Sequence, residues 1–367
     1  MSRHAGHLLG LAALALAMAW LYGEIDHLGA FADVDLKHYR ALAQGAADVP
    51  RPFAHRVLGP LFVGLLPVAD PAGFRVLTSA ALAALTLGLY GFGVQLGLTA
   101  WAAALVAALL TLNPYVFGFP AFNAFQLNDV LGMALVVAAF AALPGRRWGW
   151  YALALALGAA TREVTLLVIP AALVFLWGRD RLRDDGLRWL LASLPAVAVF
   201  VGLRLALPAE GPGFAFLLLD HIGKVLDPVT WYRLLVNAWA PLALLPLVFW
   251  QTARDFAAAH RYLFAFAALV LLSALFGGDQ ERLVAPAFVA VYPLVGYVVQ
   301  THRWPRLALG VLVACAFLTS LHHLTARFPL PSRTWTVALS LFALAAVTAT
   351  GWLVKRGRAE GRKDGSL

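Results

Sequence analysis

Long apolar segments alternate with short polar ones along the whole chain. We place twelve such segments, rich in Ala, Leu and Val, at roughly residues 6–22, 76–96, 100–118, 129–144, 148–160, 164–177, 189–206, 235–250, 262–276, 285–300, 307–323 and 335–354. A helix needs about 20 apolar residues to cross about 30 Å of hydrocarbon, and its backbone must be satisfied internally in lipid. Because the segments lack the period-two alternation of barrel strands, the pattern predicts an all-α polytopic membrane protein with about 12 transmembrane helices.

The basic residues predict how these segments are oriented. They gather in every second connection and in the tail: Arg146, Arg147, Arg179, Arg181, Arg183, Arg188, Arg254, Arg261, Arg303, Arg306, Lys355, Arg356 and Arg358. By the positive-inside rule these connections and both termini are cytoplasmic. We therefore expect a multi-pass protein of the inner (plasma) membrane, with 1–367 as a single integral membrane domain, outer loops at 23–75 and 207–234, and a cytoplasmic tail at 355–367. The segment 57–69 is short and contains Pro60 and Pro67, which favours an interfacial helix in the first outer loop.

Composition supports the same class of protein. Charged residues make up 13% of the chain, against about 25% in soluble domains, and the mean hydropathy is +0.78. Basic loops facing anionic lipid explain the net charge of +9, so the predicted partners include membrane lipid and no nucleic acid. The chain contains no P-loop, CxxC, HExxH or GxSxG motif.

Acidic side chains in the first outer loop form an Asp-x-Asp pair. Asp33 and Asp35 offer carboxylates that suit a divalent cation, Mg²⁺ or Mn²⁺, and Asp35 begins a short predicted interfacial helix. Capping of that helix is an equally good explanation of the pair. Further along the loop, Arg51, His55 and Arg56 suit either a phosphate at headgroup depth or ordinary anchoring to headgroups.

Three later segments bring polar side chains to the same predicted face. The second outer loop delivers Asn123, Asn128 and Asp129, whose oxygens suit a metal or sugar hydroxyls, although Asp129 is also favourable at a helix N-terminus. Arg162 and Glu163 separate two apolar runs too short for full crossings, and the alternative to a functional role is a buried ion pair between helices. Arg282 follows a Gly-Gly turn, where its guanidinium would suit a phosphate or would pair with Asp279 or Glu281.

The order of these features resembles the GT-C superfamily of membrane glycosyltransferases, including its mannosyl- and arabinosyltransferase-like members. The resemblance rests on one crossing followed by Asp35-x-x-x-Tyr39-x-x-x-Ala43, a second acidic outer loop, Thr161-Arg162-Glu163, and Arg282-x-x-x-Pro286. It implies a polyprenyl-phosphate-linked sugar donor and an extracytoplasmic active site. It also implies Asp35 as catalytic acid with Asp33 as neighbour or metal ligand, Asp129 as second acid, and Arg282 on the lipid phosphate. Leu36 departs from the family pattern of two consecutive acids, which puts metal dependence in doubt.

The chemistry expected of such a site is sugar transfer to a glycan, lipid or protein acceptor. A base is needed for the acceptor hydroxyl, and positive charge is needed for the leaving phosphate. With Asp35 as the single carboxylate base, inversion at the anomeric carbon is expected by analogy with inverting glycosidases. Two other classes stay open. A secondary transporter or lipid flippase would place its site at the midplane, usually with an internal repeat. An oligosaccharide polymerase or ligase would depend on arginines and histidines and not on Asp33 or Asp35.

Overall fold

The computed structural model describes residues 3–23, 35–46, 48–207, 209–210, 222–324, 328 and 332–364, and within these ranges it contains helices and no strands. The helices are α1 (Arg3–Leu21), α2 (Asp35–Ala43), α3 (Leu58–Gly64), α4 (Asp70–Gln95), α5 (Ala100–Thr111), α6 (Phe119–Phe122), α7 (Leu127–Ala142), α8 (Trp148–Ala159), α9 (Val168–Trp177), α10 (Leu182–Ala206), α12 (Pro228–Leu235), α13 (Leu245–Val248), α14 (Trp250–Ala259), α15 (Arg261–Ala274), α16 (Gln280–Val284), α17 (Phe288–Thr301), α18 (Arg306–Ser320) and α19 (Arg333–Asp364). Asp33, much of the predicted outer loop 207–234 and the end of the tail lie outside the described residues.

Six helical segments in the described part are long and apolar enough to cross a membrane, or up to eight if each bent pair counts as one span. The bent pairs are Ala100–Thr111 with Pro114–Phe122, at 60°, and Trp250–Ala259 with Arg261–Ala274, at 99°. The predicted crossings at 148–160, 164–177 and 307–323 correspond to shorter apolar helices. The protein is therefore an all-helical, multi-pass chain, while the exact number of twelve crossings stays a prediction.

One predicted crossing, 235–250, is wrong as a continuous helix. Here α12 ends at Leu235, a 3-10 turn covers Asn237–Trp239, and α13 spans only Leu245–Val248 before α14 begins. Pro241 and Pro246 explain the interruption, because proline lacks the N–H that a continuing helix would use. An apolar run alone therefore overestimated helical continuity.

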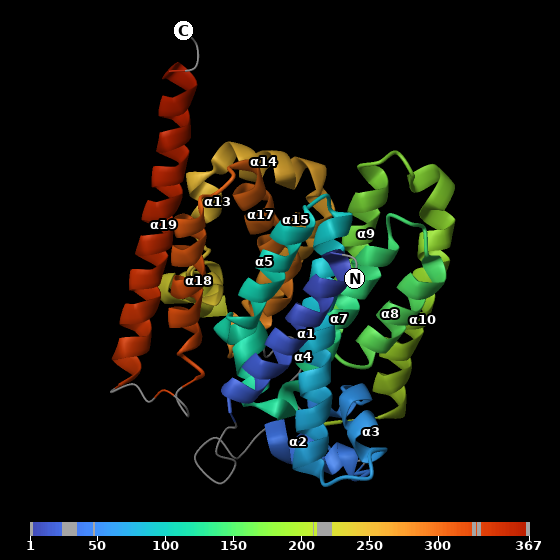
Figure 1. The fold of residues 1–367 in the computed structure, drawn as a ribbon. Coiled ribbons are helices and arrows are strands. Elements are labelled where there is room, and N and C mark those ends of the chain that lie inside the picture. The colour runs from blue at the N-terminus through green and yellow to red at the C-terminus, as the bar shows by residue number, and fades with distance from the viewer. Residues whose placement is uncertain are drawn as a thin grey trace.

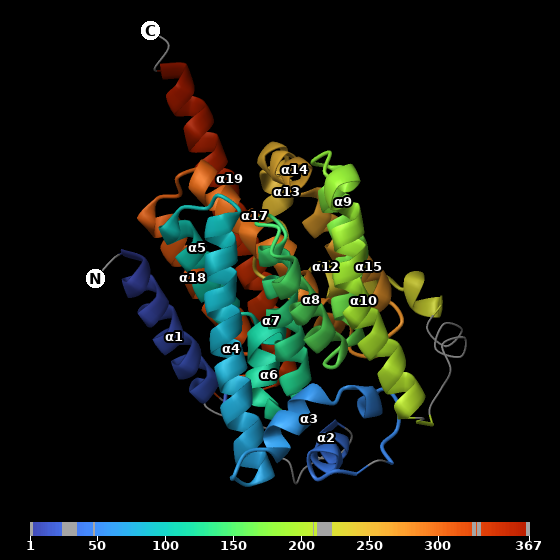
Figure 2. The ribbon, with the colours of Figure 1, turned by 90° about the vertical axis from the view of Figure 1, so that its right-hand side faces the viewer.

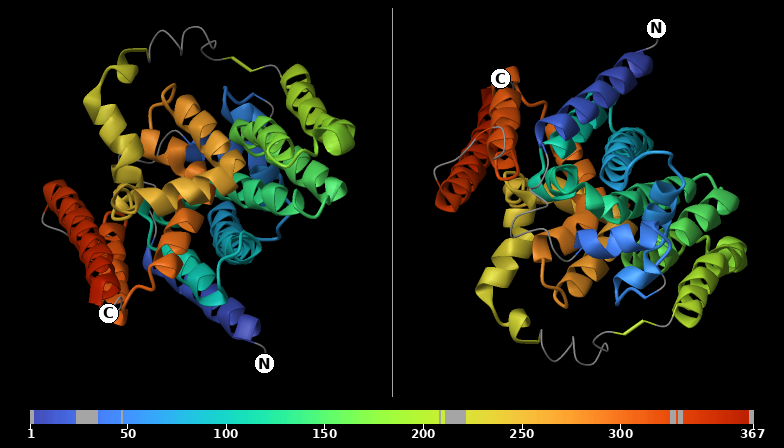
Figure 3. Two further views of the ribbon diagram at one scale, coloured as in Figure 1. Left: turned by 90° about the horizontal axis from the view of Figure 1, so that it is seen from above. Right: turned by 90° about the horizontal axis from the view of Figure 1, so that it is seen from below.

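The helices pack around one continuous core of buried apolar side chains. Leu85, Leu89 and Phe92 of α4 are buried, as are Phe140 of α7 and Phe266 of α15, and the rings of Phe140 and Phe266 meet edge to face at 5.2 Å between centroids. Figures 1 and 2 show α2 and α3 at the end of the bundle opposite the C-terminus. Seen from above and from below (Figure 3), α18 and α19 stand together at one edge.

Candidate active site

Four charged side chains from separate elements meet near the end of the bundle where α2 and α3 lie. Asp35 is the first residue of α2, Asp129 lies in the first turn of α7, and Arg282 lies in α16. Arg162 comes just before a 3-10 turn, Glu163–Leu167, that follows α8. Each sits at a helix start or break, so its side chain can face the neighbouring elements instead of the lipid.

Arg282 is surrounded by three carboxylates. Its Nη1 lies 2.9 Å from Oδ2 of Asp35, and its Nε lies 3.4 Å from Oδ2 of Asp279 and 3.8 Å from Oδ2 of Asp129. Gln126 Nε2 donates a second hydrogen bond to Oδ2 of Asp35. The predicted pairing of Arg282 with Asp279 therefore occurs, but as part of a larger cluster centred on this guanidinium.

The local backbone before Arg282 is suited to this crowding. A Cβ built on Gly277 would lie only 1.8 Å from Cδ1 of Leu283, so a side chain at this turn would require Leu283 to move. The absence of a side chain lets α16 fold back closely over the preceding turn, which brings Arg282 toward Asp35 and Asp129.

Arg162 and Glu163 do not pair with each other as the helix-tying alternative supposed. Arg162 Nη1 lies 2.8 Å from Oδ2 of Asp129, and both side chains are buried. The approach of α7 is close, because a Cβ on Gly132 would contact the Arg162 Cβ at 3.4 Å. The Asp129–Arg162 pair therefore joins α7 to the break between α8 and α9.

Glu163 instead lies between two arginines. Its Oε2 is 3.3 Å from Nη2 of Arg56, and its Oε1 is 3.1 Å from Nη2 of Arg204. Arg56 also donates to the hydroxyl of Tyr39, one turn after Asp35 on α2, at 3.5 Å. Two guanidinium groups thus share one carboxylate, which leaves an excess positive charge beside the Asp35–Arg282 cluster.

The sequence prediction missed Arg204 and Gln126. Arg204 lies in the last turn of α10, and a cation there is also favoured by the helix dipole alone. Its position within four residues of the end of an apolar crossing was the available signal. Gln126 precedes the predicted Asn128 and Asp129, but an amide next to an acidic turn gave no indication of its partner.

The remaining predicted residues have other surroundings. Asn128 supports the Arg56 segment, since its Oδ1 accepts from the Gly59 N–H and its Nδ2 donates to the Arg56 carbonyl, both at 3.0 Å. His55 Nε2 donates to the Leu207 carbonyl at 3.1 Å. Arg51 has an exposed side chain and donates its backbone N–H to the Glu210 carbonyl at 2.9 Å. Asn123 follows α6 as its C-cap. Among the described contacts, neither the Arg51 guanidinium nor the Asn123 amide makes an ion pair or side-chain hydrogen bond with the cluster.

Asp35 and Asp279, two acids of the cluster outside the membrane-spanning segments, have pKa values shifted in opposite directions. Burial alone would raise the pKa of Asp35, but the Arg282 guanidinium and the Gln126 amide hold that pKa below its usual range. For Asp279 burial dominates, and its pKa is raised. Asp35 is therefore held ionised beside Arg282.

A divalent cation finds few ligands in the described part of the chain. No group of three or more His, Cys, Asp or Glu side chains in these residues is arranged to hold a metal. Oδ2 of Asp35 is already engaged by Arg282 and Gln126. The described residues therefore supply only Asp35 of the predicted pair, and Asp33 lies outside them.

Comparison with known proteins gives distant similarities only. No protein-family model matches the chain, and no curated protein matches it in sequence. The fold is similar to a crystal structure of ArnT from Cupriavidus metallidurans in the apo state, with 14% identity over 96% of this chain and 76% of that chain and a TM-score of 0.48. A second structure of ArnT, bound to undecaprenyl phosphate, gives 15% identity over 95% and 76% and a TM-score of 0.45. These likenesses concern the fold alone, and no function follows from them.

Proposed function

We propose that the protein is a glycosyltransferase that moves a sugar from a polyprenyl-phosphate donor to an acceptor at the extracytoplasmic face of the inner membrane. The observation that carries the proposal is the contact between Asp35 and Arg282, residues 247 positions apart, which joins the buried Asp129–Arg162 pair in one cluster. The GT-C resemblance of the motifs that supply these residues supports the same assignment. The acceptor is a glycan, a lipid or a protein.

Asp35 is the base in this proposal. It is ionised beside Arg282, and a positioned carboxylate can accept the proton of an acceptor hydroxyl as the new glycosidic bond forms. The bond between the anomeric carbon and the phosphate oxygen breaks in the same step, and inversion follows because one carboxylate acts without a covalent intermediate. Asp129 and Arg162 hold Arg282 and its surroundings in place. A cation, Mg²⁺ or Mn²⁺, at Asp33 and Asp35 stays a proposal on which no step here depends.

The leaving phosphate is best accommodated by Arg56 and Arg204. Arg282 is already near three carboxylates, and these would repel a phosphate dianion. By contrast, Glu163 is the one carboxylate in a described ion pair with Arg56 or Arg204, and the side chain of Arg204 is 31% exposed. Guanidinium groups bind phosphate oxygens in a bidentate way, so this pair can stabilise the charge that develops on the leaving group. Arg282 then acts chiefly on Asp35.

A transporter or flippase is less well supported by the same contacts. The clustered charges lie at helix starts near one end of the bundle, whereas transporter sites lie near the midplane. A polymerase or ligase would need the arginines but would keep its activity without Asp35.

The test replaces Asp35 with Asn and measures transfer from a panel of radiolabelled polyprenyl-phosphate sugars by the purified protein in detergent. Asp35→Asn removes the base while keeping the shape, so transfer should fall at least about 10²-fold. Asp48→Asn, an exposed acid in the same outer segment, is the matched control and should leave transfer unchanged. Activity of Asp35→Asn within a few-fold of wild type would exclude Asp35 as the base and favour the polymerase or ligase.

A further inference from the structure

Two apolar grooves lie side by side along α4, α7 and α8, and none of their lining residues belongs to the Asp35–Arg282 cluster. The larger has a volume of about 720 Å³ and the smaller about 320 Å³. They share a wall made by Leu135, Ala138 and Ala141 of α7 and Leu157 of α8, and both include Arg147. The larger groove extends to Ala84, Gly88 and Gly91 of α4, and the smaller to Trp150, Leu153 and Ala154 of α8.

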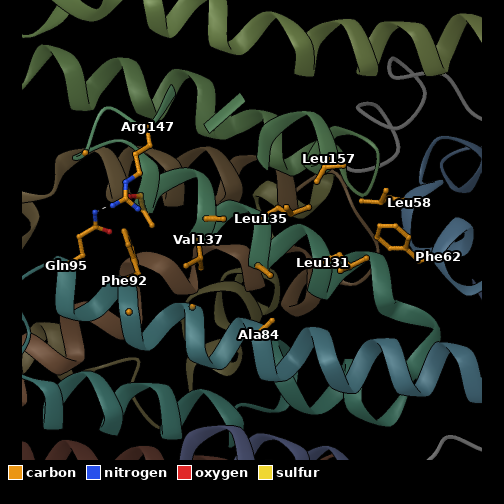
Figure 4. A pocket seen from close by; sticks show the side chains of 16 residues that line it. Leu58, Phe62, Ala84, Phe92, Gln95, Leu131, Leu135, Val137, Arg147 and Leu157 are labelled. Atoms are coloured by element: carbon orange, nitrogen blue, oxygen red, sulfur yellow. Dashed lines mark hydrogen bonds between the residues drawn. The ribbon is translucent and has the colours of Figure 1, made fainter. Parts of the chain in front are cut away.

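The larger groove has a polar end and an apolar end. Figure 4 shows Arg147 and Gln95 at one end and Leu58 and Phe62 at the other. Its α7 wall runs from Leu131 to Ala141, which is about 15 Å at 1.5 Å per residue. That length is half of the roughly 30 Å hydrocarbon layer, and the groove continues beyond it to Leu58 and Phe62 of α3, so it is long enough for one acyl chain.

The charge at the polar end has no ion-pair partner among the described residues. Arg147 is the one ionisable side chain in the lining of either groove, and no described ion pair involves it. The adjacent Arg146 differs, because its Nε lies 2.8 Å from Oδ2 of the buried Asp185. Gln95 is oriented by a hydrogen bond from its Nε2 to the Ala141 carbonyl at 2.9 Å. An anionic group placed at this end would meet an unpaired guanidinium.

We propose that the paired grooves bind one anionic two-chain phospholipid, with one acyl chain in each groove and the phosphate on Arg147. Two adjoining apolar channels with one common cation match a lipid whose two chains meet at one charged headgroup. The bound lipid would fill the space between α4, α7 and α8 and so support α7, which carries Asp129 at its far end. The inference uses no residue of the proposed catalytic cluster and is independent of the proposed reaction.

The test measures binding of phosphatidylglycerol and phosphatidylcholine to the delipidated protein in detergent by native mass spectrometry. Wild type should prefer the anionic lipid about fivefold, the effect of one cation near a membrane surface. Arg147→Gln should abolish the preference. Arg183→Gln removes an exposed arginine of α10 that has no described ion-pair partner, and it should keep the preference.

A second variant tests the acyl chains separately from the headgroup. A Cβ on Gly88 would meet only Val137, at an ordinary 3.5 Å, so Gly88→Leu can fill the larger groove without a clash at the backbone. This variant should weaken the binding of both lipids by a similar factor and leave the preference for the anionic lipid intact. Equal binding of the two lipids by wild type, equal behaviour of Arg147→Gln and Arg183→Gln, or unchanged binding by Gly88→Leu would each overturn the proposal.

Discussion

Arg282 shows how far the chemistry of a single residue can be predicted before its neighbours are known. The alternation of basic and acidic connections along the sequence predicted that Asp35, Asp129 and Arg282 lie on the same side of the membrane. The structure brings these three side chains into one cluster. The partner of each charge could not be predicted, because it depends on side-chain packing between elements distant in sequence. Arg204 was missed for the same reason, since only tertiary packing shows that it reaches Glu163.

Replacing Arg282 with Gln should move the acid limb of the pH–activity profile of transfer to higher pH. With Arg282 present, the pKa of Asp35 is lowered despite burial. Without this cation the raising effect of burial is opposed only by the Gln126 amide and by Arg56, so the pKa of Asp35 rises and the base becomes protonated at a higher pH. Arg40→Gln, on the same helix but paired with Asp70, should leave the limb in place. An unshifted limb in Arg282→Gln would show that Arg282 does not set the protonation of Asp35.

Replacing Arg204 with Gln should weaken donor binding more than it slows the chemical step. The variant removes the excess positive charge beside Glu163, while Glu163 keeps Arg56 as a partner. We expect the KM for the polyprenyl-phosphate sugar to rise about tenfold, corresponding to about 1.4 kcal/mol, with kcat changed less. Arg183→Gln, at the opposite end of α10, serves as the charge-matched control. Equal KM values for the two variants would place the phosphate elsewhere, with Arg282 as the next candidate.

Helix positions were predicted better than helix continuity. The apolar runs located α8, α15 and α18 to within three residues at both ends, whereas α4 begins six residues before the predicted start. Hydrophobicity over a dozen or more residues determines where a chain can enter lipid. The break at 235–250 depended on Pro241 and Pro246. Likewise, the gap between the two short apolar runs at Arg162 was recognised, but the docking of α7 through Gly132 was not.

The Asp129–Arg162 pair should be important for the attachment of α7. Arg162→Met leaves Asp129 buried beside the more distant Arg282 Nε at 3.8 Å, and removing one partner of a buried pair costs about 3–5 kcal/mol. Asp129→Leu combined with Arg162→Met removes both charges and should recover most of the unfolding free energy without restoring transfer. Denaturant unfolding in detergent measures the free energy of unfolding of both variants. A double variant no more stable than Arg162→Met would mean that the pair does not act as a coupled unit.

At the scale of the whole molecule, charge is distributed between the two ends of the bundle. The paired acids and arginines gather near α2 and α3, while the C-terminal end of α19 lies at the opposite end (Figures 1 and 2). By the positive-inside rule, the end that carries Lys355, Arg356 and Arg358 of α19 is predicted to be cytoplasmic. The orientation of the molecule in the membrane stays a prediction.

That orientation can be tested with single cysteines, because the chain has one native cysteine, the buried Cys315, which can be replaced by Ala. Asp48 is exposed near α2, and Arg183 is exposed at the start of α10, whose 25 residues span about 38 Å. Asp48→Cys should therefore react with an impermeant maleimide in intact cells, whereas Arg183→Cys should react only after permeabilisation. The Cys315→Ala protein without a new cysteine gives the background. The reverse pattern would place Asp35 and Arg282 on the cytoplasmic side, and the sugar donor would then have to be bound from that side.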